Sequence, residues 1–248
     1  EEYYKVQNRR KEEGLKTADV SKHMIFTGNP GTGKTTVARI LAAIYRDLGV
    51  VSKGHLVETD RSGLIGEYVG TTAPKVNHLC DSAYGGVLFI DEAYALCTGS
   101  QQDYGPEAIA TLLKRMEDDR DNLVVIVAGY PAEMETFLES NPGLRSRFNN
   151  YIDFPDFTAE ELYTMFLSRA ADYDYSLTDD AKSFVRSHMI SKIAENNRNF
   201  GNARYVRNLF EKCITAHSNR VAKLKNHTTK DLTLMKKEDI EAALRAKK

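Results

Sequence analysis

Cysteine is scarce in this chain, and the few cysteines present are not paired along the sequence. Only three occur, Cys80, Cys97 and Cys213, and none belongs to a C-x-x-C motif. Proteins that depend on disulfides carry cysteines in larger, usually even numbers. The count therefore disfavours a disulfide framework. It is typical of a cytoplasmic protein whose thiols are small buried side chains.

Long apolar runs and an excess of charge of one sign are also missing. No stretch approaches the roughly 18 apolar residues of a membrane-spanning helix, and no charged-then-apolar signal opens the chain. The formal net charge is −1, so no overall field attracts nucleic acid or an anionic membrane. A local basic stripe would still be compatible with this total.

Histidines are too dispersed to form a metal centre of their own. The six of them show no H-E-x-x-H or comparable spacing, which argues against a metal ion held by protein ligands alone. The chain begins with Glu-Glu-Tyr-Tyr rather than Met, so we expect a fragment of a longer protein. Its 248 residues, 42% hydrophobic and 28% charged, are typical of one large globular domain or two modest ones.

The most informative segment that is present runs G-N-P-G-T-G-K-T, from Gly28 to Thr35. It matches G-x-x-x-x-G-K-[ST], the loop that wraps the phosphates of a nucleoside triphosphate. Glycines let the backbone N–H groups turn toward the phosphates, and the following helix directs its N-terminus at the same charge. We expect Lys34 to reach the β- and γ-phosphates of ATP and the Thr35 hydroxyl to bind Mg²⁺. The predicted nucleotide-binding residues are Gly28, Asn29, Pro30, Gly31, Thr32, Gly33, Lys34, Thr35 and Thr36.

The surroundings of this loop predict an α/β fold. An apolar strand precedes it and a helical pattern follows it, which is the frame that the motif requires. Up to about Phe154, short apolar strands alternate with helices, a pattern typical of a parallel sheet flanked by helices. Strands are expected at 23–27, 55–59, 86–90, 122–128 and 150–154, and helices at 34–48, 71–84, 105–118 and 131–139, after a charged lead-in helix or linker at 1–17.

The pattern changes at the turn formed by residues 155–158. Thr158, with Glu161 three residues later, has the sequence of a helix N-cap, and the chain beyond it is expected to be entirely helical. Helices are predicted at 159–171, 178–195, 202–221 and 236–245, with polar connectors at 196–201 and 224–234. The sequence thus predicts two domains: an α/β nucleotide-binding core at 1–155 and a smaller helical domain at 156–248.

Two carboxylates follow the apolar strand at 86–90. Asp91 and Glu92 would lie at the carboxyl end of a buried parallel strand, where open α/β sheets bind their ligands. We expect Asp91 to hold Mg²⁺, directly or through water, and Glu92 to act as the general base for the attacking water. A strand that merely ends in two solvated acids is the alternative. The phosphate loop upstream makes that alternative the weaker one.

Two short motifs complete a recognisable set. Ser146-Arg147-Phe148 precedes the last strand, and Gly201-x-Ala203-Arg204 opens a helix of the second domain. Each arginine alone would more often form a surface salt bridge. Together with the phosphate loop and the F-I-D-E run, however, these motifs resemble the AAA+ ATPases. The runs 23–36, 53–57, 85–94, 123–130 and 140–147 are similar to the branch that contains stage V sporulation protein K and the red-type Rubisco activase.

This resemblance implies a P-loop ATPase core followed by a small all-helical lid, assembled as a ring of six identical subunits. Each active site would lie at a subunit boundary. Arg147 would be the arginine finger that acts on the next subunit's nucleotide, with Arg145 beside it, and Arg204 would be the sensor-2 arginine. The family's small polar residue after the fourth strand is replaced here by Tyr130, whose hydroxyl could take its role. The upstream segment that helps to hold adenine is expected to be missing.

The resemblance also gives a role to the loop Leu64–Gly70. In this family the corresponding loop lines the central pore, and its aromatic residue, here Tyr68, grips a polypeptide. A flat ring can press on any extended chain without recognising its sequence. The alternative is an ordinary turn with a packed tyrosine. Residues 101–105 form a second candidate pore loop.

We therefore expect an Mg²⁺-dependent ATPase that remodels an unidentified protein client in the pore of a ring. A nucleic-acid motor of the same superfamily is a second hypothesis, and it requires a basic pore. The charged residues around the proposed pore loop are mostly acidic: Glu58, Asp60, Arg61 and Glu67. A nucleotide-gated scaffold is a third hypothesis, but a scaffold has no need of Glu92 or Arg147.

Overall fold

The computed structural model describes residues 2–16, 20–97, 104–195 and 200–246, and these form two compact units. The first unit comprises Glu1–Gly28 and Gly33–Phe154. The second comprises Asn29–Thr32 and Pro155–Lys248. By its contacts, the tip of the phosphate loop therefore belongs to the second unit, although the strand before it and the helix after it belong to the first.

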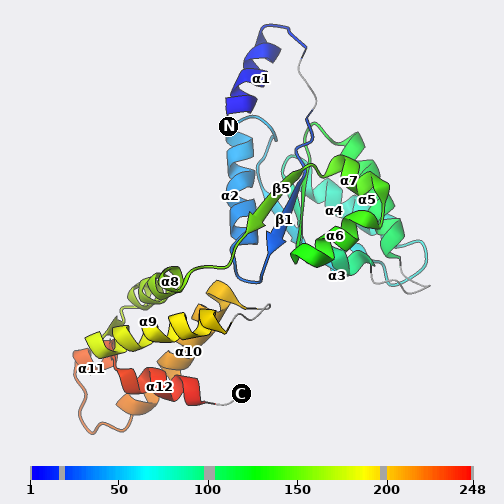
Figure 1. Ribbon diagram of the computed structural model, residues 1–248. Coiled ribbons are helices and arrows are strands. Elements are labelled where there is room, and N and C mark those ends of the chain that lie inside the picture. The colour runs from blue at the N-terminus through cyan, green and yellow to red at the C-terminus, as the bar shows by residue number, and fades with distance from the viewer. Residues whose placement is uncertain (1, 17–19, 98–103, 196–199, 247–248) are drawn as a thin grey trace. The chain divides into compact units, whose positions relative to one another are not determined.

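The first unit is built on a five-stranded parallel sheet with the order β2-β3-β4-β1-β5. Figure 1 shows β1 beside β5, the strand at one side of this sheet. In the register, Thr59 pairs with Ile90, and Ile90 pairs with Val127. The loops that follow these strands consequently leave the sheet at one edge. The predicted α/β fold is confirmed, and each predicted strand is present within two residues of its expected bounds. The strands are β1 (Met24–Gly28), β2 (Leu56–Thr59), β3 (Val87–Ile90), β4 (Val124–Gly129) and β5 (Asn150–Phe154).

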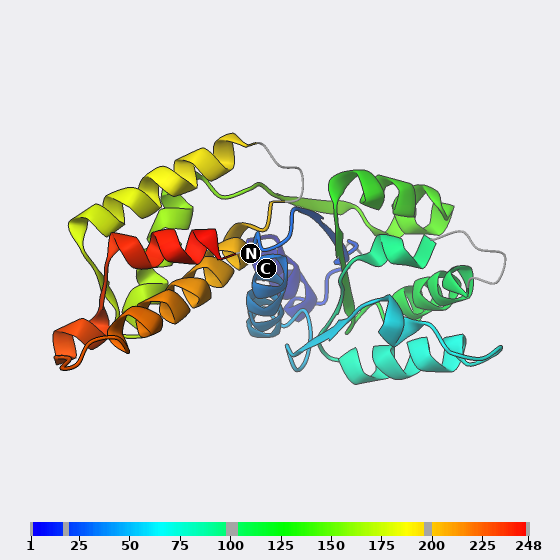
Figure 2. The ribbon, with the colours of Figure 1, turned by 90° about the horizontal axis from the view of Figure 1, so that it is seen from below.

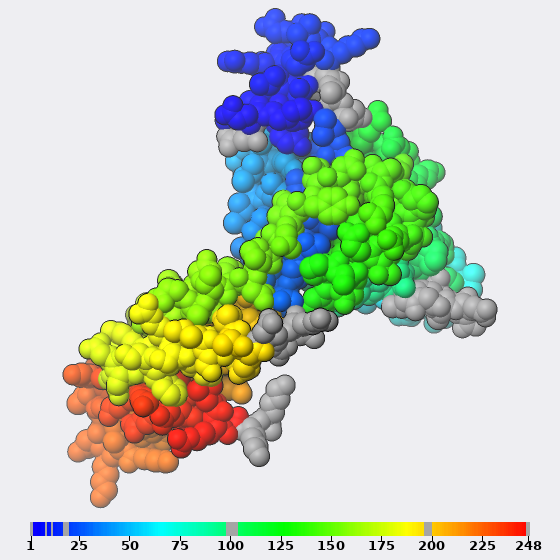
Figure 3. Space-filling view, in the orientation of Figure 1, coloured from blue at the N-terminus to red at the C-terminus, as the bar shows by residue number. Residues whose placement is uncertain are grey.

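Helices cover both faces of this sheet. On one face, α2 (Lys34–Asp47) packs Ala38 and Ala42 among the strand residues Phe26 and Phe89. The helices α4 to α7 cover the other face, and α6 and α7 form a continuous green surface in the space-filling view (Figure 3). Their bounds are α4 (Thr72–Ala83), α5 (Gly105–Asp118), α6 (Pro131–Glu139) and α7 (Pro142–Arg147), and the unit also contains α1 (Glu2–Glu12), α3 (Arg61–Leu64) and the 3₁₀ helix η1 (Ala93–Cys97).

The second unit is a small bundle in which α9, α10 and α12 lie side by side (Figure 2). Thr158 caps its first helix as expected: its hydroxyl accepts a hydrogen bond from Glu161 N, and the Glu161 carboxylate accepts one from Thr158 N. Phe166 and Phe210 form the centre of its apolar core. The helices are α8 (Ala159–Asp172), α9 (Asp179–Ala194), α10 (Asn202–Val221), α11 (Thr229–Thr233) and α12 (Lys237–Arg245).

The expectation of a purely helical second domain is wrong in two details. Ser176–Leu177 (β6) and Leu234–Met235 (β7) form a short parallel pair, and α11 lies inside the segment expected to be a polar connector. Two-residue strands are too short to show an alternating pattern. The α11 helix is only five residues long, and it depends on the reciprocal cap between Thr228 and Asp231. Among the described residues, no helix is long and apolar enough to cross a membrane.

A buried histidine before β1 forms a hydrogen bond with the central strand of the sheet, β4. His23 precedes β1 and is only 5% exposed. Its Nδ1 accepts a hydrogen bond of 3.0 Å from Val125 N in β4, and its ring lies 6.0 Å from the Phe148 ring. Burial lowers the pKa of His23 from 6.5 to about 4, because the charged imidazolium would lose its hydration.

This histidine is expected to make the folded first unit sensitive to acid. Between pH 6.5 and 4 the unfolded chain binds a proton at His23 that the folded chain does not bind. The free energy of unfolding therefore falls as the pH falls through this window, by on the order of 3 kcal/mol at most from this group. Urea unfolding at pH 7 and pH 4.5 measures the effect. His23→Gln should show a smaller loss between the two pH values, and an equal loss would contradict the assignment.

Candidate nucleotide site

The first unit supplies both ends of the phosphate loop. Gly28 closes β1 with a φ of +146°, and a side chain there would come within 2.3 Å of Phe154 O in the neighbouring strand β5. Only glycine tolerates both the conformation and the contact. Gly33 has a left-handed backbone and precedes α2, and Lys34 Nζ donates a hydrogen bond of 2.7 Å to Gly28 O. The lysine is thus folded back over its own loop, where a phosphate group would compete for it.

The second unit contains the tip of the loop. Thr32 Oγ1 donates to Asn29 O at 2.8 Å, which closes the turn. Gly31 O accepts a hydrogen bond of 3.2 Å from Ala203 N at the start of α10. A side chain on Gly31 would come within 2.3 Å of Gly201 O, so a larger residue would separate the tip from this helix.

The two acidic residues stand at the expected edge of the sheet in the first unit. Asp91 N donates to Thr59 O at 2.8 Å, which holds the end of β3 beside the end of β2. Asp91 Oδ1 accepts a hydrogen bond of 3.0 Å from Glu92 N. Glu92 itself is exposed and has a φ of +49°, an uncommon conformation for a non-glycine residue. Such strain is frequent at functional sites.

Thr35 and Asp91, the two predicted Mg²⁺ ligands, line one hollow of about 390 Å³. A hydroxyl and a carboxylate are oxygen ligands of the kind that Mg²⁺ prefers, together with waters and substrate phosphates. Within the described parts of the chain, no cluster of His, Cys, Asp and Glu could hold a metal by itself. The residues therefore fit an ion that arrives with the nucleotide. The remaining residues that line this hollow are Glu58, Thr59, Asp60, Ser62, Gly63 and Phe89.

Sequence reasoning missed the contribution of β2 to this hollow. Asp60 follows β2 and accepts hydrogen bonds from Ser62 N and Gly63 N, which cap α3. The hydrogen bond from the Ser62 hydroxyl, followed by these two backbone bonds, lowers the pKa of the Asp60 carboxyl group. A second hollow of about 520 Å³ is lined by Glu92, Arg61 and Lys75, among others. The carboxyl ends of β2 and β3 meet at one edge of a parallel sheet, so the E-T-D run could have been found by that rule.

Two tyrosines lie near the acidic residues. The rings of Tyr94, in η1, and Tyr130, at the end of β4, are 5.9 Å apart. Burial raises the pKa of Tyr94 to about 12, and the charge of Glu92 acts in the same direction. Tyr94 is therefore a neutral hydrogen-bond donor at physiological pH. Tyr130 immediately precedes α6, so the residue after the fourth strand lies at the carboxyl edge of the sheet in the first unit.

Arg147 is the last residue of α7 in the first unit, and its side chain forms an ion pair within its own chain. Its Nη2 lies 3.3 Å from Glu117 Oε2 at the end of α5, and its side chain is 29% exposed. Glu117 also pairs with Arg120 at 3.1 Å. The Nε of Arg147 is buried without a hydrogen-bond partner among the described residues. Its neighbour Arg145 is more exposed and pairs with Glu135 and Glu139.

Arg204 belongs to the second unit, in the first turn of α10. Its side chain is exposed, and its backbone N would lie 2.9 Å from a side chain on Gly31. The predicted sensor arginine and the tip of the phosphate loop therefore lie close together in this unit. Arg147, Asp91 and Glu92 all belong to the first unit.

Tyr68 stands on a turn between α3 and α4, and its side chain is 72% exposed. Thr71 closes the turn: its Oγ1 donates to Tyr68 O at 2.7 Å and accepts from Tyr68 N at 3.2 Å. Val69 is 84% exposed, so two large apolar side chains face solvent together. The alternative of a packed tyrosine is thereby excluded. In the second candidate pore loop, residues 101–103 lie outside the described residues.

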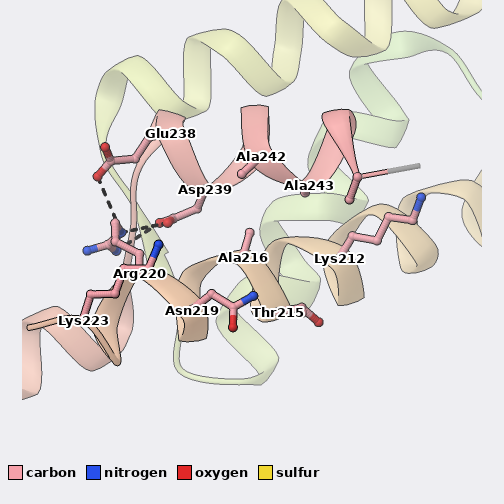
Figure 4. A pocket seen from close by; sticks show the side chains of 11 residues that line it. Lys212, Thr215, Ala216, Asn219, Arg220, Lys223, Glu238, Asp239, Ala242 and Ala243 are labelled. Atoms are coloured by element: carbon pink, nitrogen blue, oxygen red, sulfur yellow. Dashed lines mark hydrogen bonds and ion pairs between the residues drawn. The ribbon is translucent and has the colours of Figure 1, made fainter. Parts of the chain in front are cut away.

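The second unit also contains a groove of about 430 Å³ between α10 and α12 (Figure 4). Its floor consists of alanines, and Arg220 closes one end with a two-pronged ion pair to Asp239 at 2.7 and 3.0 Å. Hydrogen bonds with this geometry are strong, and they join the two helices. Asn219 and Thr215 line the same side of the groove on α10.

Comparison with protein families and known proteins gives a consistent result. A family model described as "ATPase family associated with various cellular activities (AAA)" matches residues 24–156, and a model described as "AAA lid domain" matches residues 158–248. The chain is 42% identical over 236 residues to stage V sporulation protein K of Bacillus subtilis, covering 95% of this chain and 73% of that protein. It is 43% identical to a chloroplastic ribulose bisphosphate carboxylase/oxygenase activase of Cyanidioschyzon merolae, covering 95% of this chain and 80% of that protein.

Solved structures resemble the fold at lower identity. The FIGL-1 AAA domain in complex with ADP has a TM-score of 0.65 at 18% identity, covering 97% of this chain and 76% of that one. A structure that describes katanin self-assembly has a TM-score of 0.60, also at 18% identity, and covers 97% of this chain and 77% of that one. At this identity the likeness concerns the fold alone.

Proposed function

Because the chain belongs to the AAA family of ATPases, we propose that it is an Mg²⁺-dependent motor that uses ATP to remodel a protein client in the pore of a homo-oligomeric ring. The observation that carries this proposal is the edge of the first unit's sheet. There Thr35 and Asp91 line one hollow, and Glu92 follows directly. The residues proposed for phosphate binding, metal binding and base catalysis therefore lie at one edge of the sheet.

Each residue has a definable task in hydrolysis. Lys34 exchanges its hydrogen bond with Gly28 O for the β- and γ-phosphate oxygens. Thr35 and Asp91 would hold Mg²⁺, which would supply positive charge against the phosphates. Glu92 takes a proton from the attacking water. Arg147 leaves Glu117 to contact the γ-phosphate of the nucleotide on the next subunit. Arg204, in the lid, senses the γ-phosphate at the phosphate loop of its own subunit.

Tyr68 supports a polypeptide as the client. A tyrosine and a valine held on a short turn provide an exposed apolar grip that needs no particular sequence. The charges that line the neighbouring hollow are of both signs, Arg61 and Lys75 beside Asp60, Glu67 and Glu92. A surface that follows a nucleic-acid backbone is predominantly basic. A protein motor is therefore favoured over a nucleic-acid motor.

ATPase rate against protein concentration tests the proposal, with and without an unstructured polypeptide such as a reduced, carboxymethylated protein. The rate per subunit should rise with concentration because Arg147 acts on a neighbour, and the polypeptide should raise it further. Tyr68→Ala should keep the basal rate and lose the stimulation. Tyr84→Ala, which removes another exposed tyrosine of the same unit, is the matched control and should behave like the wild type.

Three outcomes separate the hypotheses. Stimulation by single-stranded nucleic acid in place of the polypeptide would favour the nucleic-acid motor. A rate near zero at every concentration, in a chain that binds ATP, would favour the nucleotide-gated scaffold. Equal stimulation of Tyr68→Ala and the wild type would overturn the proposed pore residue.

A further inference from the structure

A buried asparagine occupies an unusual position at the start of α10. Asn202 is fully buried, with 0% exposure, and has a φ of +46°. A non-glycine residue rarely adopts this conformation, and asparagine is among the few that tolerate it. Burial of a polar side chain is also costly unless it is hydrogen-bonded. Both features indicate that its surroundings hold the residue in place.

The Asn202 amide connects three segments that are far apart in the sequence. Its Oδ1 accepts a hydrogen bond of 2.9 Å from Phe157 N, in the segment that leads into α8. Its Nδ2 donates to Asp156 Oδ1 at 2.7 Å, and lies 3.1 Å from Phe200 O and 3.4 Å from Pro30 O. The last of these oxygens belongs to the tip of the phosphate loop.

Asp156 also forms hydrogen bonds of its own with the tip of the phosphate loop. Asn29 Nδ2 donates to both of its carboxylate oxygens, at 2.9 and 3.0 Å. One carboxylate therefore accepts hydrogen bonds from Asn29 and from Asn202, and these bonds are stronger than those between neutral groups. Gly31 O, which accepts from Ala203 N, adds a backbone contact to the same helix.

We infer that Asn202 is a positioning residue for the nucleotide site: together with Asp156, it fixes the tip of the phosphate loop to the first turn of α10. The tip and the first turn of α10 are parts of one compact unit. A change in the loop when phosphates bind or leave is thus transmitted to α10 through hydrogen bonds, in addition to the proposed role of Arg204. The link to nucleotide turnover rests on the proposed function, whereas the network itself does not.

Hydrogen–deuterium exchange of the nucleotide-free chain tests this inference directly. Asn202→Asp keeps the shape and tolerates the positive φ, but it places a carboxylate against Asp156 and removes the donor to Pro30 O. Peptides covering residues 28–35 should exchange about tenfold faster, which corresponds to about 1.4 kcal/mol. ADP affinity, measured by calorimetry, should fall by a similar factor because the loop must be ordered again on binding.

A second substitution makes the test specific. Asp156→Asn should have a smaller effect, since its amide oxygen can still accept from Asn29 and Asn202. When combined with Asn202→Asp it should restore slow exchange, because it removes the repulsion between the two carboxylates. Asn219→Asp adds the same charge to the groove side of α10 (Figure 4) and should exchange like the wild type. Asn202→Gly, which keeps the backbone and lacks the amide, replaces Asn202→Asp if that variant does not fold.

Two results would overturn the inference. The first is wild-type exchange at residues 28–35 in a folded Asn202→Asp or Asn202→Gly variant. The second is a double variant that exchanges as fast as Asn202→Asp alone. If instead the wild type binds neither ADP nor ATP, the proposed function fails, and the exchange measurement still decides whether the network holds the loop.

Discussion

Glu92→Gln should lower kcat for ATP hydrolysis by about 10²–10⁴-fold while ATP still binds, because the amide cannot accept the proton of the attacking water. The residue follows β3 and is exposed, so the loss should not arise from unfolding. Single-turnover hydrolysis, together with the dissociation constant of ATP, separates the chemical step from binding. We also expect this variant to accumulate ATP-bound oligomers, which sedimentation velocity can measure.

The matched control for Glu92→Gln is Glu133→Gln. Glu133 is an exposed glutamate in the first turn of α6, in the same unit. Its replacement changes the net charge by the same amount and should leave kcat close to the wild-type value. If Glu92→Gln hydrolysed ATP as fast as this control, Glu92 could not be the general base.

Lys34→Ala should weaken ATP binding by about 10²-fold or more. The substitution removes the cation that faces two phosphate groups, and a hydrogen bond to a charged group is worth about 1.5–3 kcal/mol. Fluorescence titration with a labelled nucleotide measures the loss. Since Lys34 also donates to Gly28 O, the melting temperature of the nucleotide-free variant should fall slightly.

Lys53→Ala provides the comparison for Lys34→Ala. Lys53 is an exposed lysine between α2 and β2 in the same unit. Its removal lowers the overall positive charge equally but leaves the phosphate loop unchanged, so ATP affinity should stay within about twofold of the wild type. Normal ATP binding by folded Lys34→Ala would remove the phosphate-loop assignment altogether.

The elements of the fold follow closely from local patterns. The strand β3 is a run of four buried residues, and α5 begins and ends at the residues its periodicity predicts. A continuous apolar run followed by two acids marks β3, and a helical repeat over 14 residues with a proline in its first turn marks α5, so local chemistry and tertiary packing favour the same structure. The elements that were missed, such as α3, α7, α11 and the pair of β6 and β7, are six residues long or shorter. Segments of that length carry no periodic signal, and they form where neighbouring parts of the chain hold them.

The residues of the candidate site fall into two similar groups: those that the sequence predicts and those that only the tertiary structure brings to light. The sequence alone predicts its central residues, because phosphate binding requires glycines, a lysine and a hydroxyl at fixed spacing within one loop. It also determined the α/β core and the helical second domain, since periodicity is a local property. The roles of Asp156 and Asn202 were decided only by the tertiary structure. Their roles depend on contacts with segments far away in the chain, and a hydrogen bond between residues 29 and 156 or 30 and 202 leaves no spacing rule in the sequence.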